Sequence, residues 1–129
     1  MSRRLLQSVN VVLALLTIAA AGASLMMGMA SPIYGNGSAD LVPALDSNLR
    51  FLGGLGLGLG LTLLWITPSI ERQGTLFRVV WGCAFLGGAG RIVSWLTVGA
   101  PPLPMLLFAL IEVCIIPGLI YWQWRVQSS

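Results

Sequence analysis

Charged residues are scarce in this chain, and lysine and histidine are absent altogether. Of its 129 residues only 9% are charged, against about 25% in a typical soluble domain, while 57% are hydrophobic. Without histidine the chain cannot provide a histidine general base, a histidine-ligated metal site or a histidine ligand to haem. The low charge leaves too little polar surface for a soluble domain. It indicates an integral membrane protein.

Cysteine is also rare. The two cysteines, Cys83 and Cys114, lie far apart in the sequence, each within an apolar stretch. No C-x-x-C motif is present, which argues against a thioredoxin-type redox motif and against a zinc site. Both are therefore expected to be small packing residues in the interior. The sequence predicts no metal site and no cofactor.

Long apolar runs dominate the rest of the sequence. Four stretches, at about residues 5–27, 49–66, 77–98 and 104–124, approach the ~20 residues that a helix needs to cross the hydrocarbon core. They do not alternate as barrel strands do, and each is about twice as long as such a strand. A helix also satisfies its own backbone groups in lipid. The sequence therefore predicts an all-α, antiparallel up-down four-helix bundle that forms one transmembrane domain over residues 1–129.

The first apolar stretch has a second interpretation. Arg3 and Arg4 precede it and it contains Ala21-Gly22-Ala23, a pattern typical of a secretory signal with an A-x-A cleavage site. The apolar run continues to Met27, however, beyond the ~7–15 residues usual for such a signal. An uncleaved membrane helix is therefore expected.

The distribution of arginines predicts the orientation of the bundle. One membrane face gathers Arg3, Arg4, Arg72, Arg78 and Arg125. The other face has Arg50 alone, close to Asp40 and Asp46. Because cytoplasmic loops are enriched in positive residues, both termini are expected in the cytoplasm. Interfacial aromatic residues fit this orientation, with Trp95 toward the outside and the others toward the cytoplasm: Trp65, Trp81, Tyr121, Trp122 and Trp124.

Two charges, Arg91 and Glu112, fall inside predicted helices. Counted along the helices from the loop that connects them, both lie about 10–12 Å below the outer surface. Equal depth, opposite sign and adjacent helices predict an ion pair. Each unpaired charge would cost at least ~2.5–3.5 kcal/mol near a helix centre. Such a pair either marks a functional site or fixes helix packing, and both interpretations stay open.

Further polar residues fall near the same outer end. Together with the intramembrane charges they form one candidate outward-facing cluster: Asp46, Asn48, Arg50, Arg91, Ser94 and Glu112. If the second helix begins by Asp46, this residue can pair with Arg50 four positions later. Pro117 is expected to kink the fourth helix and open space beside Glu112. The cluster is the candidate site for a ligand head group.

Glycines and one asparagine are expected to hold the helices together. Gly54 and Gly58 are four residues apart, as are Gly56 and Gly60, and small residues at this spacing let helix backbones approach closely in lipid. Gly87 and Gly88 place small residues on a face of the third predicted helix in the same way. The simpler interpretation is tight helix packing. The alternative is a glycine-walled cleft that admits a lipid tail or a quinone. Asn10, a lone polar residue in the first helix, is expected to make an interhelical hydrogen bond.

Taken together, these motifs resemble a known family. They are Asp46-x-Asn48-x-Arg50-Phe51-x-Gly53-Gly54, Gly87-Gly88-x-x-Arg91-x-x-Ser94, Gly99-x-Pro101, and Glu112 with Pro117. Over nearly the whole chain they resemble the small bacterial membrane proteins of domain-of-unknown-function family 4345. The resemblance implies four helices in a bacterial inner (cytoplasmic) membrane and no established activity. The layout is also loosely similar to DoxX-like four-helix proteins, some of which are accessory subunits of redox complexes.

These features favour a non-catalytic accessory or self-assembling membrane subunit. The alternative is a binder or carrier of a lipid, quinone or other amphiphile, with Arg50 and Arg91 facing its head group. An enzyme is disfavoured because no nucleophile–base pair, metal set or cofactor motif is present. The expected partners are membrane lipids and either another membrane protein or a second copy of the chain. No nucleic-acid partner is expected.

Overall fold

The computed structural model describes residues 2–34 and 43–128, and four long helical spans make up most of it. The elements are α1 (Arg3–Met27), η1 (Gly28–Ala30), η2 (Pro32–Tyr34), α2 (Pro43–Ile66), η3 (Thr67–Ser69), α3 (Gly74–Thr97), α4 (Leu103–Leu110), the π-helical segment η4 (Ile111–Ile115) and α5 (Ile116–Gln127). No strand occurs in the described residues. Each span has 24 to 28 residues and is apolar enough to cross a membrane. The predicted all-α membrane fold is thus confirmed.

The second helix begins earlier than the sequence predicts. It starts at Pro43 rather than near residue 49. Proline suits the first position of a helix because its ring presets the helical φ, and Asp46 in the first turn complements the positive end of the helix dipole. The predicted first loop is therefore partly helical, since η1 and η2 also lie in it. Asp40, used above for the orientation, lies outside the described residues.

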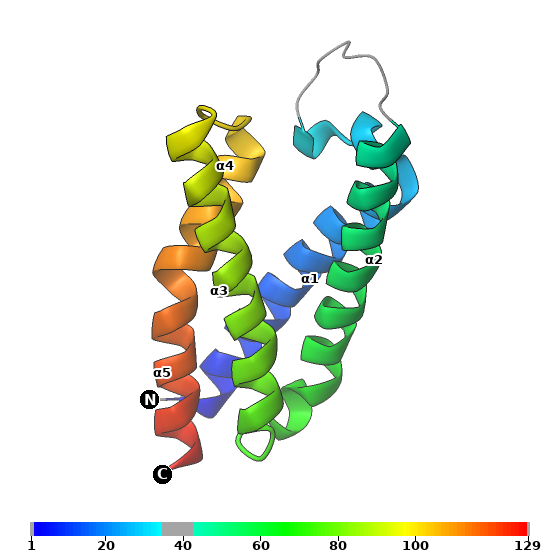
Figure 1. Cartoon of the computed structure of the whole chain (residues 1–129). Helices are drawn as coiled ribbons and strands as arrows, with labels where there is room; N and C mark the ends of the chain where they lie inside the picture. Colours follow the sequence, from blue (N-terminus) through cyan, green and yellow to red (C-terminus); the bar gives the residue numbers. More distant parts are fainter. Residues whose placement is uncertain (1, 35–42, 129) are drawn as a thin grey trace.

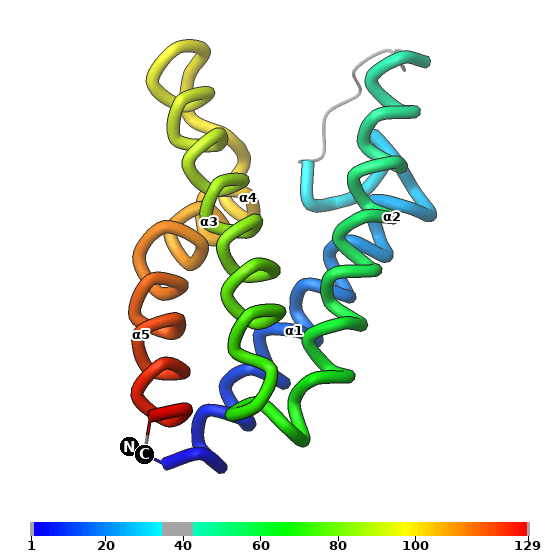
Figure 2. Tube along the Cα trace, turned by 60° about the horizontal axis from the view of Figure 1, so that its bottom comes forward, coloured from blue at the N-terminus to red at the C-terminus, as the bar shows by residue number. Residues whose placement is uncertain are grey.

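The spans associate as two helix pairs. One pair is α1 with α2, and the other is α3 with the α4–η4–α5 span. Figure 1 shows successive spans running in opposite directions, with both chain ends at the same end of the molecule. The two pairs lie together at that end and diverge toward the other, which Figure 2 shows from a second direction. This divergence leaves the space in which the candidate site lies.

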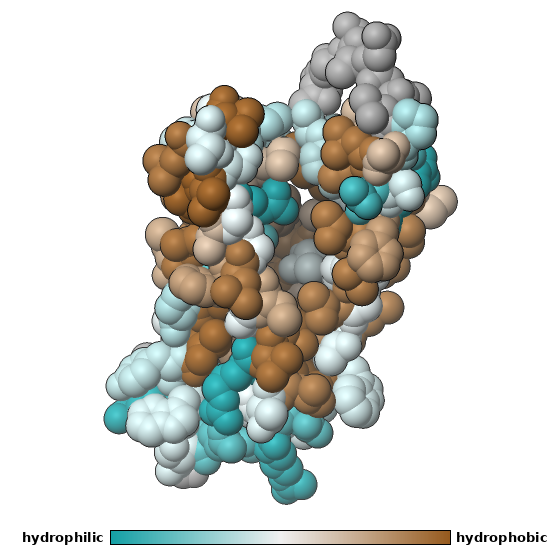
Figure 3. Space-filling view, viewed as in Figure 1, coloured by the Kyte–Doolittle hydropathy of each residue, from teal (hydrophilic) through white to brown (hydrophobic). Residues whose placement is uncertain are grey.

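The buried core is small and sits mainly where the helix pairs converge. Its largest members include Leu6, Leu63, Ile70, Phe77 and Ile116. Most other apolar side chains face outward, as Figure 3 shows over the flanks of the bundle. An exposed apolar surface of this extent suits a chain whose surroundings are lipid. Outward-facing positions also include Cys83 and Cys114, so the expected packing role of the two cysteines in the interior is wrong.

A buried asparagine connects the two helix pairs. Asn10 is completely buried, and its side-chain amide donates to the Leu63 carbonyl (3.1 Å) and to Thr67 Oγ1 (2.9 Å). Its side-chain oxygen accepts from Trp81 Nε1 at 2.9 Å. The predicted interhelical hydrogen bonding of Asn10 is confirmed, and its side chain makes three such hydrogen bonds. Trp81 is only 4% exposed, so its ring packs in the core, and its predicted depth toward the cytoplasmic side stays a prediction.

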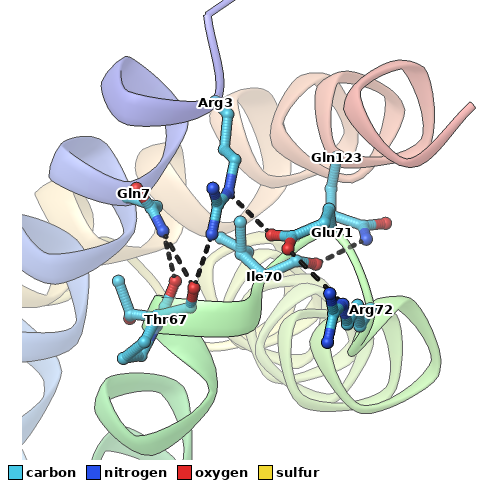
Figure 4. Close-up of polar contacts among 8 residues, drawn as sticks. Arg3, Gln7, Thr67, Ile70, Glu71, Arg72 and Gln123 are labelled. Atoms are coloured by element: carbon cyan, nitrogen blue, oxygen red, sulfur yellow. Dashed lines mark hydrogen bonds and ion pairs between the residues drawn. The ribbon is translucent and has the colours of Figure 1, made fainter. Parts of the chain in front are cut away.

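Polar contacts also hold the converging end together, around the segment that links α2 to α3 (Figure 4). Arg3 forms an ion pair with Glu71 (2.7 Å) and donates to the Pro68 carbonyl (2.7 Å). Gln7 donates to the Thr67 carbonyl at 2.8 Å. From α5, buried Gln123 donates to the Ile70 carbonyl at 3.0 Å. The segment that joins the pairs is therefore bonded to both α1 and α5, which fixes this end of the bundle.

Within the first pair, glycines of α2 let the α1 backbone come close. A Cβ built on Gly53 would lie 2.5 Å from the Leu25 backbone nitrogen, and one on Gly60 would lie 2.6 Å from Ile18. Of the two glycine pairs predicted to allow close packing, Gly56 and Gly60 do face α1, and a Cβ on Gly56 would lie 3.0 Å from Ala21 Cβ, whereas the prediction for Gly54 and Gly58 is wrong. A Cβ on Gly54 would make only ordinary contact with Leu25 at 3.8 Å, and one on Gly58 would meet nothing within 4 Å. The helix turn places Gly53 and Gly60, seven residues apart, on one face, and points Gly58 away from α1.

Candidate functional site

Arg91 of α3 and Glu112 of η4 form the predicted intramembrane ion pair. Arg91 Nε lies 3.4 Å from Glu112 Oε2. The Arg91 side chain is 34% exposed and the Glu112 side chain 20%, so both are largely covered by the protein but not fully buried. Opposite charges held at this distance offset much of the cost of placing each one in lipid. The pair joins the two spans of the second helix pair.

Glu112 lies where the fourth span departs from regular α-helical geometry. It lies in a π-helical segment, in which the Ile116 N–H donates to the Ile111 carbonyl five residues back. Pro117 follows at once; it has no N–H to donate and its ring crowds the carbonyl of Val113. Wider turns of this kind often occur at functional sites. Pro117 thus follows a π-helical segment that contains Glu112, and the kink predicted at Pro117 stays a prediction.

Gly88 of α3 is the contact surface for the Glu112 side chain. A Cβ built on Gly88 would lie 2.6 Å from Glu112 Cβ and 3.1 Å from Glu112 Oε2. Any larger residue would therefore push Glu112 aside. The prediction that Gly88 allows close helix packing is confirmed. The same prediction for Gly87 is wrong, because Gly87 is on the outer side of α3 and a Cβ there would meet nothing within 4 Å.

Next to this pair is a cavity of about 80 Å³ between the two helix pairs. All four spans line it: Leu13, Leu16, Thr17, Leu59, Leu63, Val80, Trp81, Ala84, Phe108, Ile111, Glu112 and Ile116. Among these residues Glu112 alone is charged. Figure 3 shows a hollow in the surface between the helix pairs, with hydrophilic atoms on its α3–α4 side. The arrangement is an apolar pocket with one carboxylate in its wall.

The second predicted pair, Asp46 with Arg50, has a different role. Arg50 Nε lies 2.8 Å from Asp46 Oδ2, and Arg50 also donates to the carbonyls of Leu25 (3.1 Å) and Met26 (2.8 Å) at the end of α1. Asp46 Oδ1 accepts from the backbone of Met29 at 2.9 Å. The pair therefore satisfies backbone groups that the end of a helix leaves free.

Gly28, which sequence reasoning missed, makes this capping arrangement possible. Its φ of 55° is in the left-handed region that favours glycine. A Cβ there would also collide with the Asp46 carboxylate and the Arg50 guanidinium. The signal available in the sequence was a glycine directly after an apolar helical run.

The six polar residues predicted as one cluster are divided between the two helix pairs. Asp46 and Arg50 cap α1, whereas Arg91 and Glu112 lie between α3 and η4. In the described part of the chain no hydrogen bond or ion pair joins these two groups. The side chains of Asn48 and Ser94 are exposed and make no hydrogen bond within those same residues. A single cluster was wrong because the helix pairs diverge at this end.

The spans and the cavity define a multi-pass membrane protein of the four-helix type. Residues 5–123 match the family described as domain of unknown function (DUF4345), and the chain belongs to this family. No curated protein and no solved structure matches the chain significantly. The looser DoxX-like resemblance and a bacterial origin remain predictions.

Proposed function

We propose that this protein is a non-catalytic membrane protein that binds an amphiphile in the cavity between its two helix pairs. The observation that carries this proposal is the cavity itself, whose wall is apolar on all four spans and has Glu112 as its one charge. Ligand sites in helical bundles are typically built in this way, from facing helices with few polar groups. The alternative drawn from the sequence thus becomes the leading function.

The size of the cavity supports an organic occupant. At about 80 Å³ it is several times the roughly 10–15 Å³ that one water needs. Eleven of its twelve lining residues are uncharged, so water inside would find few partners. An apolar group gains free energy by leaving water for such a wall. The lining therefore suits the apolar part of an amphiphile better than a cluster of waters.

The proposal assigns no reaction to the site. Both cysteines face outward, so neither thiol can act on a molecule in the cavity. The lining offers one hydroxyl, on Thr17, and this group donates to the Leu13 carbonyl at 2.9 Å instead of to a base. Nucleophilic catalysis needs an activating base within hydrogen-bond reach. These side chains suit a protein that binds or carries an amphiphile without reacting with it.

Association with another membrane protein or a second copy is the other candidate function. It is favoured by Gly58 and Gly87, each on an outward face with open space above it. Small residues on outward faces let a further helix approach closely in lipid. Mass spectrometry of the protein taken gently from its membrane distinguishes the candidates. A stoichiometric protein companion supports the accessory role, and a retained amphiphile supports binding.

Filling the cavity by Ala84→Phe on α3 is expected to abolish ligand binding. In a variant that keeps Trp81 as its only tryptophan, we expect a bromine-bearing C12 alcohol to quench Trp81 fluorescence, because Trp81 lines the cavity and is only 4% exposed. Ala84→Phe fills the cavity and should abolish the quenching. Cys83→Phe adds the same side chain on the outer side of the same helix and should leave it intact. Equal quenching in both variants would contradict binding in this cavity.

We further propose that both termini lie in the cytoplasm and that the protein resides in a bacterial inner membrane. The five arginines at the end that holds both termini support this orientation. In a protein whose own cysteines are replaced by alanine, a membrane-impermeant thiol reagent should label Ala100→Cys in intact cells. It should label Ser128→Cys only after the membrane is opened. The reverse pattern would overturn the orientation.

A further inference from the structure

The hydrogen-bond donors in the cavity wall are already in use. Thr17 donates to the Leu13 carbonyl (2.9 Å), and the Trp81 indole donates to Asn10 Oδ1 (2.9 Å). All other side chains in the lining except Glu112 are hydrocarbon. An ionised carboxylate accepts hydrogen bonds and cannot donate them. The side chains of the cavity therefore offer a ligand acceptors but no free donor.

Glu112 is the acceptor that lacks a donor. Its Oε2 is buried and accepts no hydrogen bond within the described structure. The contact with Arg91 Nε at 3.4 Å is an ion pair without hydrogen-bond geometry. Oε2 is thus enclosed between Arg91 and Gly88, whereas Oε1 is not buried and accepts no hydrogen bond from the described residues. A hydroxyl in the cavity that donates to Oε1 supplies the hydrogen bond that the protein does not.

The charge of the site is already balanced. Arg91 neutralises Glu112 from the α3 side, and Arg91 is not among the residues that line the cavity. An anionic head would meet the Glu112 carboxylate first and would find no donor in the wall. A cationic head would compete with Arg91 and leave the guanidinium unpaired in lipid. An uncharged donor avoids both penalties.

We propose that the ligand of this cavity is an uncharged amphiphile whose hydroxyl group donates a hydrogen bond to Glu112. The proposal rests on the proposed function and narrows its ligand class. Gly88 and the π-helical segment are the positioning elements, because they hold the carboxylate against α3 with one oxygen free of hydrogen bonds. The apolar chain of the ligand lies against the aliphatic and aromatic lining between the helix pairs.

Matched probes test the ligand class in the variant that keeps Trp81 alone. We expect 2-bromododecan-1-ol to quench Trp81 at concentrations at least about tenfold lower than 2-bromododecanoate, because a hydrogen bond to a charged group contributes about that factor or more. The probe without a head group, 2-bromododecane, should also bind more weakly than the alcohol. Measurements are made in a detergent without hydroxyl groups, which does not compete.

Substitution of the acceptor tests the role of Glu112. Glu112→Gln removes the negative charge, and we expect the preference for the alcohol over the carboxylate to fall at least about tenfold. Glu71→Gln changes a carboxylate at the converging end, outside the cavity, and should keep the preference. Glu112→Gln could fail to fold because Arg91 loses its partner. In that case the double variant, Arg91→Gln with Glu112→Gln, removes both charges. The double variant should also lose the preference for the alcohol over the carboxylate.

The outcomes separate this proposal from the one on which it rests. If no probe quenches Trp81, the proposed function fails. If the carboxylate binds as well as the alcohol in the unsubstituted site, the cavity binds amphiphiles but the hydroxyl-donor class is wrong. Retention of the alcohol preference in the double variant would overturn the assignment of Glu112 as acceptor.

Discussion

Asn10→Leu is expected to destabilise the protein by about 2–4 kcal/mol, because interhelical hydrogen bonds in membranes contribute up to ~1.7 kcal/mol each and an orphaned buried donor costs about 1–3 kcal/mol. Leucine has a similar volume but removes all three hydrogen bonds of a completely buried side chain. The Trp81 indole N–H is then left without an acceptor in the core. Equilibrium unfolding in mixed micelles, followed by circular dichroism, measures the change.

Ser8→Ala is the matched control on the same helix. Ser8 is exposed and donates only to the Arg4 carbonyl of its own helix at 3.0 Å, so its loss should change the free energy of unfolding by less than about 0.5 kcal/mol. Trp81→Phe removes the indole N–H but leaves the ring, and it should cost less than Asn10→Leu. The two substitutions share one hydrogen bond, so their effects should be less than additive. Strict additivity would contradict the Asn10–Trp81 bond.

The sequence predicted the features that depend on composition and on position along a helix. The four spans follow from apolar runs long enough for the hydrocarbon core. The Arg91–Glu112 pair follows from equal depth on neighbouring spans, and it is present at 3.4 Å. The Asp46–Arg50 pair follows from four-residue spacing once the helix includes Asp46. Each of these needs only the local geometry of a helix or one short connection.

What the sequence could not supply is the rotation of each helix and the angle between the helix pairs. Gly54 and Gly58 have the same four-residue spacing as Gly56 and Gly60, and only packing decides which face meets α1. Trp81 is a typical interfacial residue by type, yet its N–H serves Asn10 in the core. The helix pairs diverge toward this end (Figure 2), and Arg50 of α2 pairs with Asp46 while Arg91 of α3 pairs with Glu112, although the sequence suggested one cluster.

The cavity also depends on that divergence and on the π-helical segment. Glu112, Trp81 and Thr17 come from three different spans, and no spacing in the sequence brings them together. Pro117 was the one local sign of a disturbed helix near Glu112. It indicated where space opens but not which side chains would surround that space.

Gly53→Ala is expected to destabilise the α1–α2 pair by about 1–3 kcal/mol, the usual range for overpacking. The added Cβ would lie 2.5 Å from the Leu25 backbone nitrogen and 2.7 Å from the Ala21 carbonyl oxygen. Both atoms belong to the α1 backbone, so no side-chain rotation relieves the clash, and the two helices must move apart. The same unfolding measurement in micelles reports the loss.

Gly58→Ala is the control, because it adds the same methyl group to the same helix where nothing lies within 4 Å. Alanine is a better helix former than glycine by up to ~1 kcal/mol, so this variant should be as stable as the parent or more stable. Gly54→Ala, with only an ordinary 3.8 Å contact to Leu25, should resemble Gly58→Ala. Equal destabilisation at Gly53 and Gly58 would mean that the α1–α2 contact does not run along Gly53.

The Gly53→Ala variant also tests whether the cavity depends on the α1–α2 contact. The α1–α2 pair is held by backbone contact at Gly53 and by the Arg50 cap, and the converging end is held by Asn10 and Glu71. Between the pairs lies the cavity, which side chains of all four spans line. Gly53→Ala should therefore lower stability while Trp81 stays quenched by the bromine-bearing alcohol in the protein that remains folded. Loss of quenching in folded Gly53→Ala protein would mean that the cavity depends on the α1–α2 contact instead.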